Sequence, residues 1–267
     1  MAKVTIVTPS FNQAEYLRRT IDSVLSQDVD LEYFIMDGGS TDGSVDILRE
    51  YNSRARIVIG KDKGQADAIS KGFACATGDI LAWLNSDDMY LPGTLAKVIS
   101  AFERGHEFIY GHVLIVDAKD RILRRRVALP IGFDELYYGM YTIPQETTFF
   151  SRNLYLKSGG VNPSYTYAMD YDLWLRMAKI APPHLLDEYL ACFRFHEGQK
   201  SGRNDLYVEE AERARRNLTG VPSITPFRAL RTRLMLEFRK LTANVKESGM
   251  KKTVADMIDK QRGRLPK

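Results

Sequence analysis

The first hundred residues alternate between two hydrophobic patterns. Four short apolar runs rich in β-branched and aromatic side chains predict strands at Val4–Thr8, Tyr33–Met36, Arg56–Ile59 and Ile80–Leu84. In the segments that follow them, apolar residues recur every three or four positions, as at Leu17, Ile21 and Val24, which predicts a helix after each strand. Alternating strands and helices predict an α/β fold with a mostly parallel central sheet and right-handed crossovers.

The pattern changes after residue 105. It predicts the two strands of a hairpin, one helix and one further strand, at Phe108–Asp117, Arg121–Ala128, Asp170–Ile180 and Leu185–Phe195. From about residue 204 the chain is expected to be helical and charged, with an interruption at residues 220–226. A mixed α+β half is therefore expected to follow the parallel sheet, and a helical tail to follow both.

Charge separates the tail from the rest of the chain. The 267 residues carry a net charge of +4, yet residues 203–267 contain 16 Lys and Arg against 8 Asp and Glu. The preceding residues are therefore slightly acidic. This argues against a nucleic-acid surface spread over the main domain, because phosphate binding needs clustered positive charge. A partner of the tail is expected to be anionic.

The sequence predicts a cytoplasmic protein. The two cysteines, Cys75 and Cys192, exclude a disulfide framework and a Cys-rich zinc site. The first residues turn polar at Thr8, too early for a signal peptide. The longest apolar stretch, Phe108–Val116, is about half the length of a membrane-spanning helix.

Polar residues cluster where the predicted strands end. They follow the four strands at residues 8–12, 37–43, 61–64 and 85–88, and three of these segments contain acids. In an open parallel sheet, ligands bind at the carboxyl ends of the strands, so these segments are expected to meet at one site. Carboxylates gathered in this way suit a hard divalent cation such as Mn²⁺ or Mg²⁺, which takes oxygen ligands and bridges to phosphates.

The glycine-rich segment 37–43 (D-G-G-S-T-D-G) differs from a dinucleotide fingerprint. The sequence has neither a G-x-G-x-x-G pattern nor a P-loop, which argues against hydride transfer and P-loop chemistry. Asp37, at the end of a predicted strand, is instead placed to accept hydrogen bonds from a base or a ribose.

Five blocks in this order resemble the motifs of inverting glycosyltransferases of family 2, which have the GT-A fold. The blocks are residues 4–12, 37–43, 78–88, 170–176 and 194–196. The resemblance implies transfer of a sugar from a nucleoside-diphosphate sugar to a hydroxyl acceptor. It also implies a nucleotide-sugar-binding half at residues 1–104, an acceptor half at residues 105–202 and a basic helical extension at residues 203–267. Relatives commonly build polysaccharides, O-antigens or other cell-envelope glycans, so the acceptor is expected to be a glycan or a lipid-linked sugar.

The resemblance implies roles for single residues on the donor side. Asp37 is expected to contact the nucleobase, with the backbone of Pro9 and Ser10 along it, and Asp87 is expected to reach the ribose or the donor sugar. The full set expected to bind the nucleotide sugar is Pro9, Ser10, Asn12, Asp37, Asp62, Asp67, Asn85 and Asp87.

The resemblance also implies a metal site and a catalytic base. Asp88 resembles the metal-binding acid of a DXD motif, and His196 a second ligand near the diphosphate, where a cation would neutralise charge on the leaving group. Asp170 resembles the catalytic base, which an inverting displacement needs opposite the diphosphate to take the proton of the acceptor hydroxyl. Gln145 and Glu146 are expected to face the donor sugar or the acceptor.

Several of these residues also have a purely structural interpretation. Asp170 could cap the helix that follows it, alone or with Asp172, because Asp is a favoured capping residue. His196 could be a hydrogen-bonded structural histidine, and Glu146 could belong to a polar edge strand.

Two positions depart from the family pattern. Met169 stands where many relatives have Glu beside the base, and Asn85 stands where an acid often lies. A thioether cannot raise the pKa of Asp170 by charge, so the sequence does not predict whether this pKa is raised.

The sequence leaves two other functions open. A nucleotidyltransferase also uses an α/β sheet and a carboxylate-held metal, although it would normally need a basic, glycine-rich loop where this chain has residues 9–12 (P-S-F-N). A non-catalytic nucleotide-sugar-binding protein is the second alternative, which Met169 makes conceivable.

The tail contains a basic amphipathic segment. Its apolar stripe consists of Phe227, Leu230, Leu234, Phe238 and Leu241. Its other faces carry Arg228, Arg231, Arg233, Arg239 and Lys240. Such a helix can lie on the inner face of an anionic membrane, pair with another subunit or dock on the catalytic domain.

Overall fold

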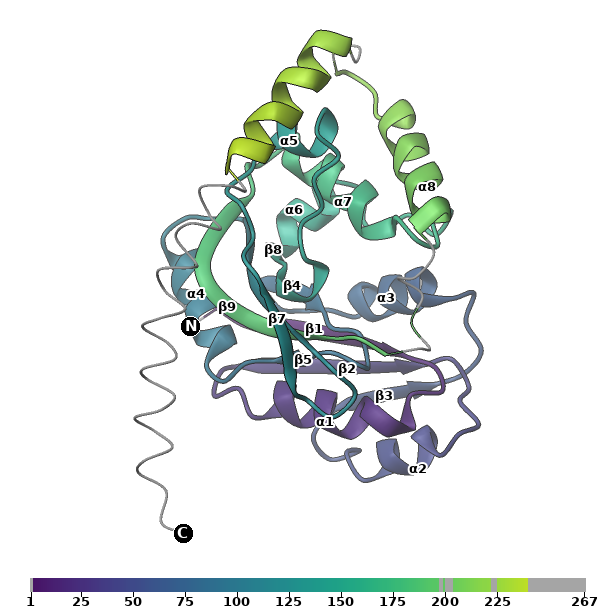
Figure 1. The fold of residues 1–267 in the computed structure, drawn as a ribbon. Coiled ribbons are helices and arrows are strands. Elements are labelled where there is room, and N and C mark those ends of the chain that lie inside the picture. Colours follow the sequence, from purple (N-terminus) through teal and green to yellow (C-terminus); the bar gives the residue numbers. More distant parts are fainter. Residues whose placement is uncertain (1, 197–198, 200–203, 222–224, 240–267) are drawn as a thin grey trace.

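The computed structural model describes residues 2–196, 199, 204–221 and 225–239, and it confirms an α/β fold around one mixed sheet (Figure 1). Within these residues, nine strands form the sheet in the order β3-β2-β1-β4-β8-β6-β9-β5, and β7 pairs with β6. The strands are β1 (Val4–Ser10), β2 (Leu31–Asp37), β3 (Arg56–Ile59), β4 (Ile80–Trp83), β5 (Met89–Tyr90), β6 (Phe108–Val116), β7 (Ile122–Arg126), β8 (Phe149–Ser151) and β9 (His184–Arg194). The chain order reverses between β1 and β4, where an open α/β sheet leaves a crevice for a ligand.

The four strands of the first half are parallel, as the sequence predicts. β2 and β4 pair with the two sides of β1, and β3 pairs with β2. Apolar residues alternate between the faces, so that Val4 and Ile6 lie in one buried cluster and Val7 lies in the other. Because the strands run in one direction, the polar residues at their carboxyl ends lie along the same edge of the sheet.

The second half mixes both strand directions. β6 and β7 form the hairpin that the sequence predicts, and β9 runs parallel to β6. β8 lies antiparallel between β4 and β6, and β5 pairs antiparallel with β9. β5 and β8 are not predicted from the sequence, because two and three residues are too few for a periodic signal.

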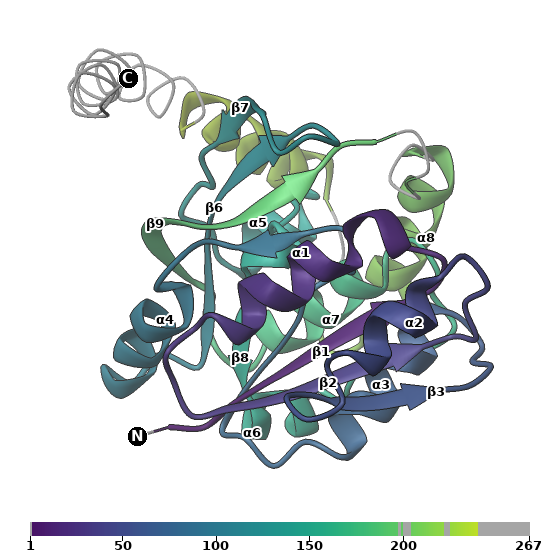
Figure 2. The same ribbon diagram turned by 90° about the horizontal axis from the view of Figure 1, so that it is seen from below.

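Helices cover both faces of the sheet (Figures 1 and 2). They are α1 (Ala14–Leu25), α2 (Ser44–Arg49), α3 (Gln65–Ala74), α4 (Thr94–Glu103), α5 (Phe133–Tyr137), α6 (Arg152–Lys157), α7 (Met169–Ala178) and α8 (Asn204–Asn217), with a 3-10 turn, η1, at Gln145–Thr147. The buried residues of α1, α2 and α4 belong to one apolar cluster, and those of α3, α6 and α7 belong to the cluster on the opposite face.

The described residues after 203 pack on α5 and α7. Ala211 and Ala214 of α8 are buried in the same cluster as α7. A last helix, residues 226–239, lies over α5 and buries Leu236 (Figure 1). Lys240 and Leu241, which the sequence places on this helix, lie outside the described residues. In the part of the chain that the structure describes, no helix combines the length and apolar character needed to span a membrane.

Candidate active site

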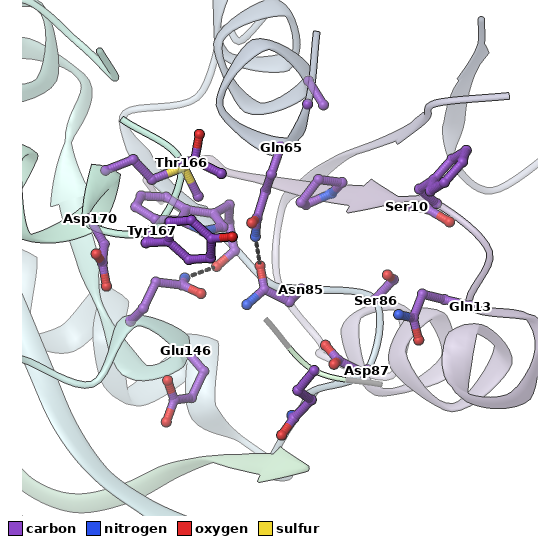
Figure 3. Close-up of a pocket in the computed structure, with 18 of the residues that line it drawn as sticks. Ser10, Gln13, Gln65, Asn85, Ser86, Asp87, Glu146, Thr166, Tyr167 and Asp170 are labelled. Atoms are coloured by element: carbon purple, nitrogen blue, oxygen red, sulfur yellow. Dashed lines mark hydrogen bonds between the residues drawn. The ribbon is translucent and has the colours of Figure 1, made fainter. Parts of the chain in front are cut away.

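A cavity of about 1050 Å³ opens at the carboxyl ends of the parallel strands (Figure 3). One wall comes from the segments after β1, β2, β3 and β4, and the other comes from β7, η1 and the start of α7. Figure 3 shows Asp170 and Glu146 on one side and Ser10 and Gln13 on the opposite side, with Asp87 between them. The fold thus brings segments from both halves of the sequence to one space.

Most of the predicted site residues line this cavity. They are Pro9, Ser10, Asp62, Asn85, Asp87, Gln145, Glu146 and Asp170. The other predicted residues lie outside the lining, although all of them are within the described part of the chain. They are Asn12, Asp37, Asp67, Asp88 and His196.

Asp37 and Asn12 shape the glycine-rich loop. The buried carboxylate of Asp37 accepts hydrogen bonds from the backbone N–H groups of Gly39 and Ser40, at 3.0 and 2.8 Å, and from the Ser40 hydroxyl at 2.7 Å. Asn12 has a positive φ of 53°, and its side-chain oxygen accepts the N–H of Thr41 at 2.8 Å. The loop therefore presents glycine backbone to the cavity. The contact of Asp37 with a nucleobase stays a prediction.

Asp62 and Asp67 lie on either side of the turn after β3. Asp62 lines the cavity, and its Oδ1 accepts the N–H of Gly64 at 2.8 Å. Asp67 pairs with Lys71 at 2.7 Å and accepts the N–H of Lys63 at 3.0 Å. Hydrogen bonding to Lys71 holds the pKa of Asp67 below its ordinary value. Of these two acids, Asp62 is the one placed to meet a ligand.

Asp87, at the wall of the cavity, forms a pair with His196 behind it. Asp87 Oδ2 lies 3.0 Å from His196 Nε2, and both side chains are mostly buried. The His196 ring also lies against Tyr16, with ring centroids 4.7 Å apart. A carboxylate oxygen and an imidazole nitrogen are ordinary ligands of a divalent metal ion. Among the described residues, no group of three or more His, Cys, Asp or Glu is arranged to hold a metal ion.

Asp88 is buried directly behind this pair. Its Oδ1 accepts the backbone N–H of Arg194 at 3.0 Å, and its Oδ2 has no hydrogen-bond partner among the described residues. Burial raises the pKa of the Asp88 carboxyl well above its ordinary value, and the nearby charges of Asp87 and Glu146 add to the effect. Between the two neighbouring acids, Asp87 therefore faces the cavity and Asp88 faces the protein interior.

Arg194 holds the segment that carries Asp87. Its fully buried side chain donates from Nε to the carbonyl of Asp87 at 2.9 Å and from Nη1 to the carbonyl of Asp117 at 3.0 Å. It also pairs with Asp120 at the tip of the β6–β7 hairpin at 2.5 Å, and its guanidinium lies over the Tyr16 ring. The sequence pattern does not indicate this role of Arg194, because its partners lie far away in the chain.

Asp170 lies in the first turn of α7 and faces the cavity. The N-cap position belongs to Ala168, so Asp170 does not cap the helix, and Asp172 instead pairs with Arg176 at 2.5 Å. Burial raises the pKa of Asp170 to about 6, although a hydrogen bond from the N–H of Tyr171 and the charge of Arg126 oppose the rise. Desolvation thus raises the pKa of Asp170 without the neighbouring carboxylate that many relatives have at the position of Met169.

Gln145 and Glu146 lie on the 3-10 turn η1, which replaces the edge strand considered from the sequence. Glu146 is buried at the cavity wall, and this burial raises the pKa of its carboxyl while the charge of Arg126 lowers it. Gln145 donates to the carbonyl of Trp83 at 2.8 Å, so the turn is tied to the end of β4.

Two residues that the sequence analysis did not single out complete this side. Arg126 is the last residue of β7, and Tyr207 lies on α8; both line the cavity beside Asp170. The Tyr207 ring meets the edge of Tyr171, with centroids 6.4 Å apart. A single basic residue in a run of arginines, or a single Tyr in a charged helix, offers no periodic signal of its position.

Comparison with known families and proteins gives a consistent result. A sequence model described as glycosyl transferase family 2 matches residues 5–158. An uncharacterized glycosyltransferase of Nostoc sp. is 33% identical over 127 residues, which are 45% of this chain and 39% of that protein. Chondroitin synthase of Escherichia coli is 27% identical over 186 residues, which are 67% of this chain and 27% of that protein. The chain therefore spans less than half the length of these relatives.

Two solved structures share the fold. S. aureus TarS in complex with UDP-GlcNAc superposes with a TM-score of 0.63 at 17% identity, covering 80% of this chain and 65% of that chain. The mannosyltransferase PcManGT from Pyrobaculum calidifontis, in complex with GDP-Man and Mn²⁺, superposes with a TM-score of 0.63 at 18% identity, covering 88% of this chain and 69% of that chain. These similarities confirm the GT-A fold, and the match over residues 5–158 shows that the chain belongs to glycosyl transferase family 2.

Proposed function

We propose that this chain transfers a sugar from a nucleoside-diphosphate sugar to a hydroxyl group of an acceptor, with inversion at the anomeric carbon. The observation that carries the proposal is one cavity faced by both Asp87, after β4, and Asp170, at the start of α7. Membership of the family supports a glycosyl transfer, and the UDP-GlcNAc and GDP-Man held by two structural neighbours support a nucleotide-sugar donor.

The donor is expected to lie along the ends of the parallel strands. Pro9 and Ser10 line the cavity together with Gly38 and Gly39 of the glycine-rich loop, and Asp62 lines it as well. Gln65 donates a hydrogen bond to the side-chain oxygen of Asn85 at 2.6 Å. The Asn85 amide N–H₂ can therefore donate a hydrogen bond to the nucleotide sugar. Asp37 and Asn12 would act on the nucleotide through the loop whose backbone they hold.

Asp170 is the proposed catalytic base. As the acceptor oxygen attacks the anomeric carbon, its proton passes to the Asp170 carboxylate and a new carbon–oxygen bond forms. The bond between that carbon and the diphosphate oxygen breaks, and its electron pair leaves with the nucleoside diphosphate. A pKa of about 6 keeps the carboxylate ionised at neutral pH and makes it a stronger base than an ordinary aspartate.

The pair of Asp87 and His196 is the proposed contact for a divalent cation, Mn²⁺ or Mg²⁺. Asp87 offers a carboxylate at the cavity wall, and His196, outside the lining, offers an imidazole nitrogen 3.0 Å from it; a structural neighbour was solved with Mn²⁺. A cation bound there would supply Lewis-acid stabilisation of the charge on the leaving diphosphate. We assign the metal contact to Asp87 in place of Asp88, because the Asp88 carboxylate is turned to the interior and bonded to Arg194.

Gln145 and Glu146 are the proposed contacts for the donor sugar or the acceptor, since both lie on the Asp170 side of the cavity. We further propose that the transferred group is a hexosyl unit and that the product belongs to a polysaccharide, an O-antigen or another cell-envelope glycan. The chondroitin synthase among the relatives supports a glycan acceptor.

A donor panel tests this function directly. Release of nucleoside diphosphate is measured from UDP-, GDP- and dTDP-sugars with Mn²⁺ or Mg²⁺ and a set of glycan acceptors. We expect Asp170→Asn to lower kcat by about 10²–10⁴-fold, because the general base is lost. The Kd for nucleoside diphosphate should stay within about twofold, since Asp170 lies on the opposite side from the strand ends.

Further variants and products test the proposed metal contact and the two alternative functions. Asp87→Asn should weaken nucleoside-diphosphate binding in the presence of metal, while Asp28→Asn, an exposed acid in the loop after α1, should change neither binding nor turnover. Turnover of Asp170→Asn at the wild-type rate would overturn the proposed base. Release of pyrophosphate would indicate a nucleotidyltransferase, and tight donor binding without turnover would indicate a non-catalytic protein.

We also infer that the helix at residues 226–239 contacts an anionic membrane surface. Its inner face is docked on the domain: Leu236 is buried, Arg239 pairs with Glu135 at 2.9 Å, and Arg228 donates to Tyr138 at 3.1 Å. Its outer face leaves the predicted apolar stripe 59–74% exposed, at Phe227, Leu230, Leu234 and Phe238.

Charge selects the partner of this outer face. Arg231 and Arg233 are exposed on the helix, where Glu237 is the one acid of residues 226–239. An apolar stripe with cationic flanks complements a membrane with anionic lipids, because apolar side chains enter the interface while arginines meet the headgroups. This arrangement supports a peripheral location on the inner face of the cell membrane.

Vesicle sedimentation tests the membrane contact. The wild type should bind vesicles that contain phosphatidylglycerol more strongly than vesicles of phosphatidylcholine alone. The double variant Leu234→Ser with Phe238→Ser should bind at least about tenfold more weakly, because two large apolar groups no longer enter the interface. Val208→Ser, at an exposed apolar position of α8, is the matched control. Equal binding of the double variant, or a dimer that it disrupts in sedimentation equilibrium, would overturn the membrane contact.

A further inference from the structure

The loop at residues 164–168 leads directly into α7 and to Asp170; we call it the base loop. Thr166 and Tyr167 of this loop line the cavity, and Ala168 occupies the N-cap position of α7. An alanine side chain cannot accept a hydrogen bond, so the base loop depends on groups from elsewhere for its backbone partners.

Glu210 of α8 supplies these partners. Its Oε2 accepts the backbone N–H groups of Thr166 at 2.9 Å, Tyr167 at 2.7 Å and Ala168 at 2.9 Å, and its Oε1 also lies 3.1 Å from the Thr166 nitrogen. The Glu210 side chain is 15% exposed, so water competes little for the carboxylate. Hydrogen bonds to an ionised acceptor are roughly twice as strong as neutral ones, and here one carboxylate holds three consecutive residues.

Arg213, one helical turn further along α8, strengthens the same contact. Its Nη2 donates to the carbonyl of Ser164 at 2.9 Å, its guanidinium lies over the ring of Tyr165, and it pairs with Glu210 at 3.6 Å. Residues three apart on a helix are neighbours on its surface, so Glu210 and Arg213 both meet the base loop from α8, and Tyr207, one turn earlier, lines the cavity.

We propose that Glu210 is a positioning residue that fixes the base loop and, through it, the location of the Asp170 carboxylate. This inference rests on the proposed function, in which Asp170 is the base. A base must lie within hydrogen-bond reach of the proton it takes, and a misplacement of about 1 Å can lower a rate by roughly 10²-fold. Asp170 follows Ala168 by two residues, so movement of the base loop is passed directly to the carboxylate.

The test compares Glu210→Gln with Glu209→Gln. The first change keeps the size of the side chain but removes its charge and replaces one acceptor oxygen by an N–H₂ group. The second changes an exposed neighbour on the same helix. We expect Glu210→Gln to lower kcat by about 10- to 100-fold. The KM for the donor and the Kd for nucleoside diphosphate should stay within about twofold, and Glu209→Gln should match the wild type.

Hydrogen exchange gives a readout that needs no turnover. The amides of Thr166, Tyr167 and Ala168 should exchange at least about tenfold faster in Glu210→Gln, while those of Gly39 and Ser40 in the glycine-rich loop should be unchanged. In an Asp170→Asn background, Glu210→Gln should have no further effect on kcat, because the group that it positions is already lost.

The possible outcomes separate this inference from the proposed function. If the wild type turns over but Glu210→Gln keeps its kcat, or loses donor affinity in step with kcat, the positioning role is overturned. Unchanged amide exchange in Glu210→Gln would overturn it as well. If the wild type neither binds nor turns over any nucleotide sugar, the proposed function fails, and the exchange experiment still decides whether Glu210 holds the base loop.

Discussion

The two ends of the cavity are held in different ways. At the Asp87 end, the fully buried side chain of Arg194 joins the segment after β4 to the β6–β7 hairpin through carbonyl groups and Asp120. At the Asp170 end, the carboxylate of Glu210 on α8 holds the base loop from outside the sheet. Arg194 thus lies in the core of the sheet, whereas Glu210 lies on α8, a helix outside the sheet.

Because of this difference, we expect changes at Arg194 to affect mainly the stability of the fold and changes at Glu210 to affect mainly kcat. Replacing a buried, hydrogen-bonded arginine takes one hydrogen-bond or charge partner away from several polar groups, so a change at Arg194 should weaken the fold. A change at Glu210 affects one loop at the edge of the domain, so it should change kcat first. The following predictions test this contrast, from the largest expected effect to the smallest.

Arg194→Met should lower the free energy of unfolding by about 2–4 kcal/mol, because the carbonyls of Asp87 and Asp117 each lose one donor and Asp120 loses one charge partner. Nucleoside-diphosphate binding should weaken with it. Urea denaturation measures the change. Arg19→Met, which breaks the more exposed pair with Asp120, is the control and should cost less than about 1 kcal/mol. Equal effects of the two changes would contradict a special role of the buried arginine.

Asp170→Asn should raise stability at pH 7 by about 1–3 kcal/mol even though it lowers kcat. The folded-state pKa of about 6 lies above the ordinary value of 3.8, so the folded protein binds this proton more tightly than the unfolded chain. The ionised carboxylate therefore destabilises the fold above pH 6, and the penalty fades as the pH falls toward 4. Thermal denaturation at pH 7 and at pH 4 measures the difference. A variant less stable than the wild type at pH 7 would contradict the desolvation of Asp170.

The rate should fall in acid because protonated Asp170 cannot act as a base. With a pKa of about 6, kcat/KM at pH 5 should be about tenfold below its plateau at neutral pH. The charged and titratable groups near this carboxyl are Arg126 of β7, Glu146 of η1 and Tyr207 of α8. Measuring the Kd for nucleoside diphosphate at each pH separates the base from the Asp87 end. A constant kcat/KM between pH 5 and 7 would exclude Asp170 as the titrating base.

Asp120→Asn should have the smallest effect, about 0.5–1.5 kcal/mol. The change removes the negative charge that meets Arg194 at 2.5 Å, but the carbonyl partners of the arginine remain. The Asp120 side chain is 38% exposed, so water compensates for part of the loss. Nucleoside-diphosphate binding and urea denaturation should both change less than in Arg194→Met. A larger effect than that of Arg194→Met would show that the hairpin tip, and not the arginine, supports the Asp87 end.

Local patterns were enough to predict the strands of the first half. Each of these strands buries its own apolar residues, so its signal lies within a few positions of the chain. β5 and β8 escaped prediction because two or three residues become a strand only by pairing with β9, β4 and β6. β8 pairs with β4 and β5 pairs with β9, and in both pairings the partner lies more than 60 positions away in the chain. A local sequence pattern contains no information about such distant partners.

The choice between Asp87 and Asp88 shows the same limit within one motif. Asp87 lies in the turn after β4 and Asp88 lies directly before β5, and there one acid faces the cavity and the other the interior. The backbone N–H of Arg194, 106 positions away, bonds the Asp88 carboxylate and decides which one it is.

The sequence by itself determined the order of strands and helices in the first half and the polar residues at the strand ends, because both follow from neighbours in the chain. It also determined the motifs that mark the family. Only the tertiary structure decided that Asp87 faces the cavity, that burial raises the pKa of Asp170, and that Arg194 and Glu210 support the two ends. Burial and hydrogen bonding between distant segments are properties of packing, and they come into being only when those segments meet.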